Sequence, residues 1–422
     1  MGGEVKSMRA LLVAIGALVI VAACGRVPGG QVSPGDYKLY VAASTSTSQQ
    51  LSVIDSRSHS VELNMPLGTP SPDWTHLYTV KGDTLLDLDP QTGATRRSLQ
   101  LPGSMQLPPA TLSGVPGGLS PNGRWLVLES FDRTDSIPAA THMLVVDTTY
   151  VSAPRQIDLK GLFNFDAVSN DGQRVYMIQY LTGNQYHVRF YDLSIGRLDP
   201  QIVFDKSDGS AAMAGLRLSG VASPDGHWLY SMYIRENQGP FIHALSLDDP
   251  IAICIDLPGD LGYSTNPDEF RWSLTMNAAG THLYAANGAT GIVADLSIDG
   301  GVPNHQRAVQ LVGGQTANSF IQNVEAKELS GNAAALSPDG QTLVIAGKTG
   351  LVWVDTASLK ARDRQLTGWN IWSVAMAPDG ATVYAMDDTG MIAELPVKGA
   401  RAATTFGGAG GQPLALIRVA AA

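Results

Sequence analysis

The stretch that decides the fold is ALSPDGQTLVIA, residues 335–346. Ser337, Pro338 and Gly340 occupy the first, second and fourth positions of a four-residue segment, where a type I β-turn favours these residue types. Asp339, at the third position, can hydrogen-bond its own backbone. Because apolar runs flank the turn on both sides, the stretch predicts a β-hairpin.

The same turn recurs along the chain. Seven copies can be aligned, with Trp in place of Gly in the first copy and a degenerate sequence in the fifth. They are Ser71-Pro72-Asp73-Trp74, Ser120-Pro121-Asn122-Gly123, Ser169-Asn170-Asp171-Gly172, Ser223-Pro224-Asp225-Gly226, Asn277-Ala278-Ala279-Gly280, Ser337-Pro338-Asp339-Gly340 and Ala377-Pro378-Asp379-Gly380. The copies lie roughly 40 to 60 residues apart, a period typical of propellers and other repeat arrays.

Each period contains further strand-like segments. The third repeat unit, for example, has an apolar strand at 125–128, a strand that ends in aspartate at 144–147, and another at 156–159. A fourth strand leads into the next turn, and four short antiparallel strands make one propeller blade. No stretch after residue 36 has helical periodicity. The sequence therefore predicts an all-β chain with a single β-propeller over residues 37–420.

Two segment types carry a family resemblance. The unit formed by 38–42, 51–55 and 61–63 resembles the YVTN repeat of bacterial surface β-propellers, and the Ser-Pro-Asp-Gly hairpins resemble the WD40-like repeats of the TolB type. True WD40 signatures, with Gly-His and Trp-Asp at set places, are absent. The resemblance implies the fold and leaves the function open, because such propellers serve many functions.

The blade count follows from both ends of the chain. The unit that starts at Lys38 adds an eighth set of outer strands, although the short spacer between Leu63 and Ser71 keeps seven blades as a close alternative. A propeller avoids a free inner strand edge, because unpaired strand groups invite aggregation. We therefore expect the apolar strand at 413–419 to pair antiparallel with 38–42 and to close the ring.

The N-terminus reads as a targeting segment. Lys6 and Arg9 precede an apolar run, residues 10–23, that is shorter than the roughly 20 residues of a membrane span. The run ends in Val-Ala-Ala followed by Cys24, which resembles the bacterial lipobox, and the resemblance implies a lipid on the Cys24 thiol. The alternative is an ordinary signal peptide with a chance cysteine. We expect a signal peptide at 1–23, with Met8 as an alternative start, and a flexible Gly/Pro tether at 24–36.

Composition bears on partners. The formal net charge is −10 and no basic cluster is present, which argues against nucleic-acid binding. Contact with a membrane is expected through the N-terminal lipid alone. Cys254 is the only other cysteine, so an internal disulfide is not expected once Cys24 is lipidated. Cys254 lies in an apolar segment, which favours a buried thiol over a nucleophile.

Histidines and aspartates at repeat positions are the first candidates for chemistry. His76 and His282 share a repeat position and His227 is one place earlier, which favours a role in the scaffold. A series of strand-end aspartates invites comparison with a metal ring, but such residues usually bond the turn that follows. They are Asp55, Asp89, Asp147, Asp192, Asp295 and Asp355. We predict no metal site.

Motifs for cofactors and nucleophiles are weak. Residues 86–93 are similar to the turn of quinone-dependent dehydrogenase propellers, but the motif occurs once and no Cys-x-x-Cys-His is present. No Gly-x-Ser-x-Gly motif occurs either. We therefore predict no bound cofactor and assign no catalytic residue. Better candidates are the segments outside the repeat pattern, because loops on a rigid scaffold carry function. They are Ser130–His142, Ser207–Leu216, Asp260–Glu269 and Gly313–Gly331.

These observations favour an exported, lipid-anchored β-propeller that acts as a binding module at the cell envelope. Its expected partner is an envelope protein, a glycan or a small ligand. The alternative is a propeller hydrolase of the lactonase type, although no residue matches that family's motif. Three or more convergent Asp, Glu, His or Asn side chains at one channel mouth would favour the enzyme. A channel lined by small or apolar residues would favour binding.

Overall fold

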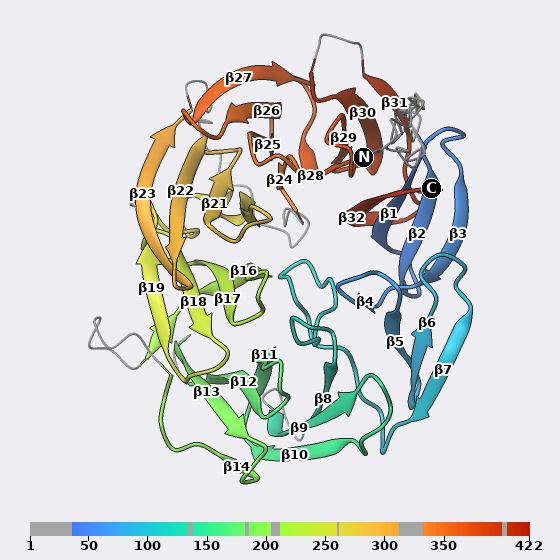
Figure 1. Cartoon of the computed structure of the whole chain (residues 1–422), viewed down its shortest axis with the longest axis vertical. Coiled ribbons are helices and arrows are strands. Elements are labelled where there is room, and N and C mark those ends of the chain that lie inside the picture. Colours follow the sequence, from blue (N-terminus) through green and yellow to red (C-terminus); the bar gives the residue numbers. More distant parts are fainter. Residues whose placement is uncertain are drawn as a thin grey trace, which may run out of the picture. The chain divides into compact units, whose positions relative to one another are not determined.

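The computed structural model describes residues 36–133, 138–181, 185–203, 212–259, 261–311, 332–398 and 403–422. In these residues, eight antiparallel sheets form a ring around a central channel, with one edge of each sheet at the channel and the other at the perimeter (Figure 1). The chain is therefore an eight-bladed β-propeller. The predicted fold class and the count of eight blades are confirmed, and the alternative of seven blades is wrong.

The blades follow one another in chain order, and the strands of each run from the channel outward in the order named. The first contains β32 (Gln412–Ala421), β1 (Tyr37–Ser44), β2 (Gln49–Asp55) and β3 (Val61–Pro66). The second contains β4 (Thr69–Pro70), β5 (Leu77–Lys81), β6 (Thr84–Leu88) and β7 (Thr95–Gln100). The third contains β8 (Trp125–Arg133), β9 (Pro138–Asp147) and β10 (Arg155–Lys160), with a single bridge from Leu119 to Leu126 on the inner side. The fourth contains β11 (Phe163–Val168), β12 (Arg174–Tyr180), β13 (Gln185–Asp192) and β14 (Arg197–Leu198), and β15 (Met213–Ala214) also pairs with β13.

The remaining four blades have four strands each. The fifth contains β16 (Leu216–Ala222), β17 (Trp228–Ile234), β18 (Phe241–Ser246) and β19 (Ala252–Asp256). A 3₁₀ turn, η1 (Pro267–Arg271), leads into the sixth, which contains β20 (Trp272–Met276), β21 (His282–Asn287), β22 (Ile292–Asp299) and β23 (Val302–Gln310). The seventh contains β24 (Ala334–Leu336), β25 (Thr342–Gly347), β26 (Gly350–Asp355) and β27 (Lys360–Gln365). The eighth contains β28 (Ile371–Met376), β29 (Thr382–Asp387), β30 (Met391–Pro396) and β31 (Thr404–Gly407).

The repeated turn joins the first and second strands of a blade, and its hydrogen bonds explain its sequence. In the seventh blade, Gly340 N donates to Ser337 O over 2.7 Å, which closes a type I turn. Ser337 Oγ donates to Asp339 Oδ1 over 2.5 Å and accepts from Thr342 N over 2.9 Å. Gln341 N donates to the same Asp339 oxygen over 3.0 Å. Serine and aspartate therefore satisfy the backbone groups that the turn leaves unpaired.

The fourth turn residue is left-handed in all seven aligned copies, with φ between 59° at Trp74 and 73° at Gly226. Glycine adopts this conformation without steric cost, which explains why six of the seven copies have glycine at this position. Neighbouring turns add a second constraint. A Cβ at Gly380 would lie 2.9 Å from Pro338 Cδ of the preceding turn, and Gly280 meets Pro224 in the same way. Proline therefore packs on glycine from one blade to the next.

Trp74 is the exception to glycine at this position. It keeps the left-handed φ, and its ring packs on Tyr40 of the first blade at a centroid distance of 4.9 Å. The guanidinium of Arg418, on β32, lies 4.7 Å from the Trp74 ring. Trp74 therefore joins the second blade to the blade that closes the ring through an aromatic and a cation–π contact.

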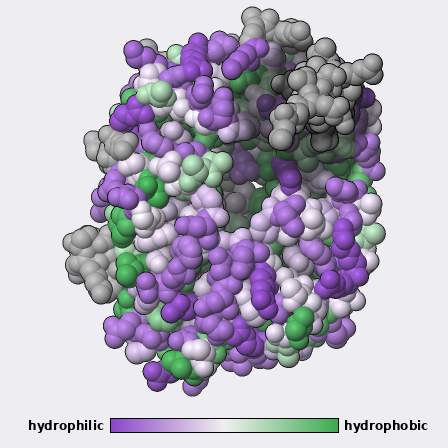
Figure 2. Space-filling view, viewed as in Figure 1, coloured by the Kyte–Doolittle hydropathy of each residue, from purple (hydrophilic) through white to green (hydrophobic). Residues whose placement is uncertain are grey.

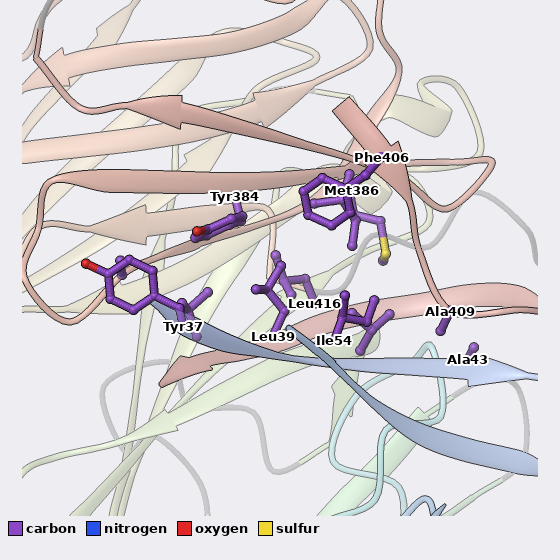
Figure 3. Close-up of a cluster of buried hydrophobic side chains, with 13 residues drawn as sticks. Tyr37, Leu39, Ala43, Ile54, Tyr384, Met386, Phe406, Ala409 and Leu416 are labelled. Carbon is purple, nitrogen blue, oxygen red and sulfur yellow. The ribbon is translucent and has the colours of Figure 1, made fainter. Parts of the chain in front are cut away.

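The ring closes through the two ends of the described chain. β1 pairs antiparallel with β32, with Lys38 opposite Ala420 and Ala42 opposite Ala415, as predicted. The eighth blade also holds β32, because Leu416 N donates to Ser373 Oγ over 3.0 Å. Buried side chains of both blades fill the space between them (Figure 3); they include Tyr37, Leu39, Ile54, Tyr384, Met386, Phe406 and Leu416.

Replacing Gly380 by Ala should destabilise the protein more than replacing Gly340 by Ala. Both residues have a similar left-handed φ, 66° and 69°, so both substitutions incur the penalty of about 1–2 kcal/mol for an L-residue there. A Cβ at Gly340 has no neighbour within 4 Å, whereas at Gly380 it meets Pro338. We expect this overpacking to cost roughly 1–3 kcal/mol more. Urea unfolding followed by tryptophan fluorescence measures both losses.

The change Pro338→Ala in the Gly380→Ala background serves as the control. It should remove the additional loss and leave only the backbone penalty. Equal losses for the two glycine variants would show that the contact between the turns carries no strain.

Candidate ligand-binding site

The long connections of the propeller share one end of the channel. In an antiparallel blade the second strand ends where the first begins. The links from second to third strand and from one blade to the next therefore lie at the same end, which we call the loop face. Each candidate segment belongs to one of these links: Ser130–His142, Ser207–Leu216, Asp260–Glu269 and Gly313–Gly331. Residues 313–331 and parts of the other three lie outside the described residues.

The connection from the second to the third blade forms a hairpin that the sequence analysis did not identify. Ala110 N donates to Val115 O over 2.8 Å, and Gly117 N donates to Pro108 O over 2.7 Å. At its tip, Leu112 N donates to Leu218 O of β16, in the fifth blade. Its base is tied to the second blade through Thr69 Oγ1, which donates to Gly117 O. This hairpin, residues 108–118, therefore reaches across the inner side of the third and fourth blades (Figure 1).

An ion pair between a buried carboxylate and a half-buried guanidinium lies beneath the hairpin. Asp166 on β11 and Arg217 on β16 approach to 2.6 Å between Oδ1 and Nη1, and Arg217 Nη2 donates to Pro109 O over 3.0 Å. The Asp166 side chain is 1% exposed. It is the extra residue of a β-bulge between Phe165 and Ala167, and bulges re-aim side chains. Its second oxygen, Oδ2, is buried without a hydrogen-bond partner among the described groups.

A second buried acid adjoins this pair. Glu129 on β8 accepts a hydrogen bond from Phe165 N over 3.2 Å, next to the bulge. Burial raises the pKa of Glu129 to about 6, against the weaker opposing effects of the Phe165 hydrogen bond, the Gln106 side chain and Arg217. Near neutral pH, the Glu129 carboxyl group can therefore be either protonated or ionised.

Two cavities flank Arg217, Phe165 and Pro109. The first has a volume of about 180 Å³ and reaches toward the repeated turns; its other lining residues include Thr69, Gly117, Gly118, Asp166, Gly220, Ala222, Leu229 and Leu247. The second, of about 160 Å³, lies toward the loop face and is also lined by Leu112, Asn164, Tyr180, Tyr186 and Tyr233. A space-filling view shows that the ring is hollowed near its centre (Figure 2).

Small residues open the first cavity. Ala222 directly precedes a repeated turn, where other blades have larger apolar residues, namely Leu119, Val168, Met276, Leu336 and Met376. Gly220 adds no side chain two residues earlier. The small side chains on the inner strand of the fifth blade therefore leave space unfilled beside it. This space is part of the first cavity, which Gly220 and Ala222 line.

Tyrosines form one wall of the second cavity. Tyr186 and Tyr233 stack at a centroid distance of 5.9 Å, and Tyr180 at the rim is 45% exposed. Burial raises the pKa of Tyr186 and of Tyr233 well above the ordinary value for a phenol. Both hydroxyls therefore stay protonated and can donate as well as accept.

The three histidines near the repeated turns pair with aspartates of the propeller scaffold, consistent with the scaffold role that the sequence pattern predicts. His76 Nδ1 lies 2.7 Å from Asp87 Oδ1, and His282 Nδ1 lies 2.8 Å from Asp295 Oδ1. Both aspartate side chains are buried, and each histidine ring stacks on the tyrosine two residues later. His227 pairs with Asp248 on the surface. None of the three lies at the Asp166–Arg217 pair.

The strand-end aspartates divide into two groups. Five of them accept hydrogen bonds from the backbone of the following turn, as expected: Asp55, Asp89, Asp147, Asp192 and Asp355. Asp295 is different, because its partners are the His282 and Arg307 side chains. The turn interpretation of Asp295 is therefore wrong, since its strand continues to Asp299 before it turns. Within the described part of the chain, no three His, Cys, Asp or Glu side chains are grouped to hold a metal ion.

Cys254 also departs from expectation. It is half-buried on β19 rather than buried, with Sγ 3.6 Å from His243 Nδ1. β19 is the outermost strand of its blade and has one unpaired edge, which explains the exposure. Cys24 lies outside the described residues, and no helix among those described is both long and apolar enough to cross a membrane.

Sequence reasoning missed Glu129, Asp166 and Arg217, although the repeat pattern contains a signal. Nine residues after the first turn residue, the other blades have apolar residues where the third has Glu129. Three residues before the turn, they have glycine or an apolar residue where the fourth has Asp166. Arg217 shares its position with Arg271, and other blades place uncharged residues there. Charges at interior repeat positions mark the site.

Comparison with known proteins supports the fold alone. The structure is similar to that of apo AztD from Citrobacter koseri, with a TM-score of 0.53, 12% identity, and coverage of 91% of this chain and 97% of that one. The dihydro-heme d1 dehydrogenase NirN in complex with DHE gives a TM-score of 0.52 and 13% identity over 92% of this chain and 76% of that one. The periplasmic gluconolactonase PpgL of Pseudomonas aeruginosa gives 0.45 and 18% over 89% and 97%. No family model and no curated protein matches the sequence.

Replacing Glu129 by Gln should change the pH dependence of stability. The folded pKa of Glu129, about 6, lies above the ordinary value of 4.5. The wild type should therefore lose stability as pH rises from about 4.5 to 6, where only the unfolded chain ionises, by about 2 kcal/mol in total. A glutamine side chain does not ionise, so this loss should disappear in the variant.

Urea unfolding at pH 4.5 and 7.5 provides the measurement, and Glu236→Gln, an exposed position, provides the matched control. The control variant should follow the wild type. If Glu129→Gln also follows the wild type between the two pH values, burial does not perturb this carboxyl group.

Proposed function

We propose that this propeller is exported, anchored to the cell envelope through lipidated Cys24, and binds a small ligand beneath the hairpin 108–118. One observation carries the proposal: two cavities flank Arg217, which pairs with the buried carboxylate of Asp166, and one oxygen of that carboxylate has no hydrogen-bond partner among the described groups. Ligand pockets are typically apolar concavities with a few placed polar groups, and this arrangement has that character.

The desolvation free energy of the charged residues at this site supports a functional role for them. Burying a charged pair takes two ions out of water, and the desolvation penalty can exceed their attraction. Other blades have glycine or apolar residues at the positions of Glu129 and Asp166, so the propeller does not require carboxylates there. A departure from the repeat that costs stability is expected where a protein has a binding task.

Binding is favoured over hydrolysis by the lining of the cavities. Asp166 lines the first cavity and Asn164 the second, while Glu129 lines neither. In the described residues, therefore, three Asp, Glu, His or Asn side chains do not converge on either cavity. The remaining lining residues are mostly small, apolar or aromatic, which supports the binding module over the lactonase-type hydrolase.

The proposed anchor rests on sequence. The apolar run at 10–23, the small residues before Cys24 and the Gly/Pro-rich segment that follows together fit a lipidated N-terminus with a tether. The tether would hold the propeller near the membrane surface, where it could bind a protein, a glycan or a small molecule of the envelope. The resemblance to YVTN and TolB-type repeats is consistent with this location.

Replacing Cys24 by Ser should release the protein from the membrane fraction. The thiol is the acceptor of the lipid, and a single hydroxyl in its place gives no thioether. Fractionation followed by mass spectrometry of the mature N-terminus measures both the location and the lipid. A Cys24→Ser variant that stays in the membrane fraction, with no lipid mass on the wild type, would refute the anchor.

Replacing Ala222 by Met should abolish ligand binding. It introduces the residue type that other blades have at this position and fills the first cavity. Native mass spectrometry, after incubation of the full chain with the small-molecule fraction of an envelope extract, should detect a ligand adduct on the wild type. Leu336→Met, at the equivalent position of the seventh blade, is the matched control and should keep the adduct. An adduct that survives Ala222→Met, or none on the wild type, would contradict the proposed site.

A further inference from the structure

We infer that the ligand of this site is a neutral, ring-sized molecule that donates an O–H or N–H hydrogen bond to Asp166 Oδ2. The inference rests on the proposed function, because it assigns the chemistry of the ligand that the cavities would hold. Three features of the first cavity carry it: an unsatisfied acceptor, a balance of charge, and a size and lining suited to one ring.

The acceptor is Asp166 Oδ2. Arg217 Nη1 satisfies Oδ1 at 2.6 Å, whereas Oδ2 is buried without a partner among the described groups and its carboxylate lines the cavity. An unsatisfied buried acceptor costs the full desolvation of that group, so a ligand that supplies a donor recovers this free energy. An O–H or N–H group satisfies a carboxylate oxygen, whereas an ether or a carbonyl does not.

The charge of the ligand follows from the lining. Asp166 and Arg217 are the charged side chains that line the first cavity, and they neutralise each other. An anion would face the carboxylate, and a cation would face the guanidinium, with no further counter-ion among the lining residues in either case. Because an unpaired buried charge is strongly unfavourable, the site selects a neutral ligand.

Size and shape follow from the remaining residues. The volume of about 180 Å³ is close to that of an apolar cavity of about 150 Å³ known to hold benzene. Phe165 and Pro109 supply flat apolar faces, and Gly117, Gly118 and Gly220 let the ligand approach the backbone closely. A six-membered ring with one donor group matches this space, whether it is aromatic or saturated.

Four ring compounds of similar size test the assignment on the full chain in detergent: phenol, anisole, benzoate and benzylammonium. Phenol is a neutral donor, anisole lacks the donor, and the other two carry opposite charges. Isothermal titration calorimetry or ligand-observed NMR gives each dissociation constant. We expect phenol to bind about tenfold or more tightly than each of the other three, as a hydrogen bond to a charged acceptor predicts.

The variant Asp166→Asn tests the acceptor directly. Asparagine can still accept from Arg217, but its amide nitrogen would replace Oδ2 with a donor. Phenol binding should weaken about tenfold, while anisole binding should stay the same. Asp87→Asn is the matched control, because Asp87 is also buried with one partner, His76, and an unpartnered Oδ2 among the described groups, yet lines neither cavity. It should leave phenol binding unchanged.

The outcomes separate this inference from the proposed function. Equal affinity for phenol and anisole, or phenol binding that Asp166→Asn leaves intact, overturns the donor assignment even where Ala222→Met removes the envelope ligand. If benzoate or benzylammonium binds more tightly than phenol, the neutrality argument is wrong. If none of the four compounds binds, the ring-sized ligand is wrong, and the Ala222→Met result decides separately whether the site binds anything. If Asp166→Asn fails to fold, the comparison of phenol with anisole on the wild type decides alone.

Discussion

The antiparallel ladder between β1 and β32 is the constraint on which the rest of the structure depends. It joins the two ends of the described chain, and without it β1 and β32 would each lose their partner and the ring would stay open. Because this pairing is non-local, its entropy cost must be met by contacts formed elsewhere first. Ser373 Oγ and the Trp74–Arg418 contact hold the same strand from both neighbouring blades. A closed ring in turn fixes the distance across which the hairpin 108–118 can reach from the second blade to the fifth.

Local chemistry explains why so much of the fold could be predicted from the sequence. In the repeated turn, Ser337, Asp339 and Gly340 determine the type I geometry through local hydrogen bonds and backbone conformation. Each copy of the turn therefore indicates one blade without knowledge of tertiary contacts. The closing strand could be predicted for a similar reason, since each end lacked the partner that the other supplied. Seven blades remained possible because β4, with only Thr69 and Pro70, is too short to recognise as an inner strand.

The candidate site could not be predicted in the same way, because its members come from four different connections and strands. Glu129, Asp166 and Arg217 meet only after the third, fourth and fifth blades are side by side. The loops singled out by length do not contain either residue of the ion pair. Histidines drew attention because they are chemically versatile, yet His76 and His282 pair with buried aspartates of their own blades. The useful signal was a charge at an interior repeat position, which requires comparison between blades rather than recognition of a motif.

The bulge at Asp166 shows how the scaffold accommodates a costly site. An extra residue between Phe165 and Ala167 turns the carboxylate off the regular ladder, and Phe165 N, like Phe163 N, donates to a side chain of the third blade, here Glu129. The two acids are therefore linked through a single backbone segment. Removing the proton from Glu129 strengthens the hydrogen bond that holds the bulge, because bonds to an ionised acceptor are stronger than neutral ones. The backbone next to Asp166 is thus held in part by a buried acid that does not line the cavity.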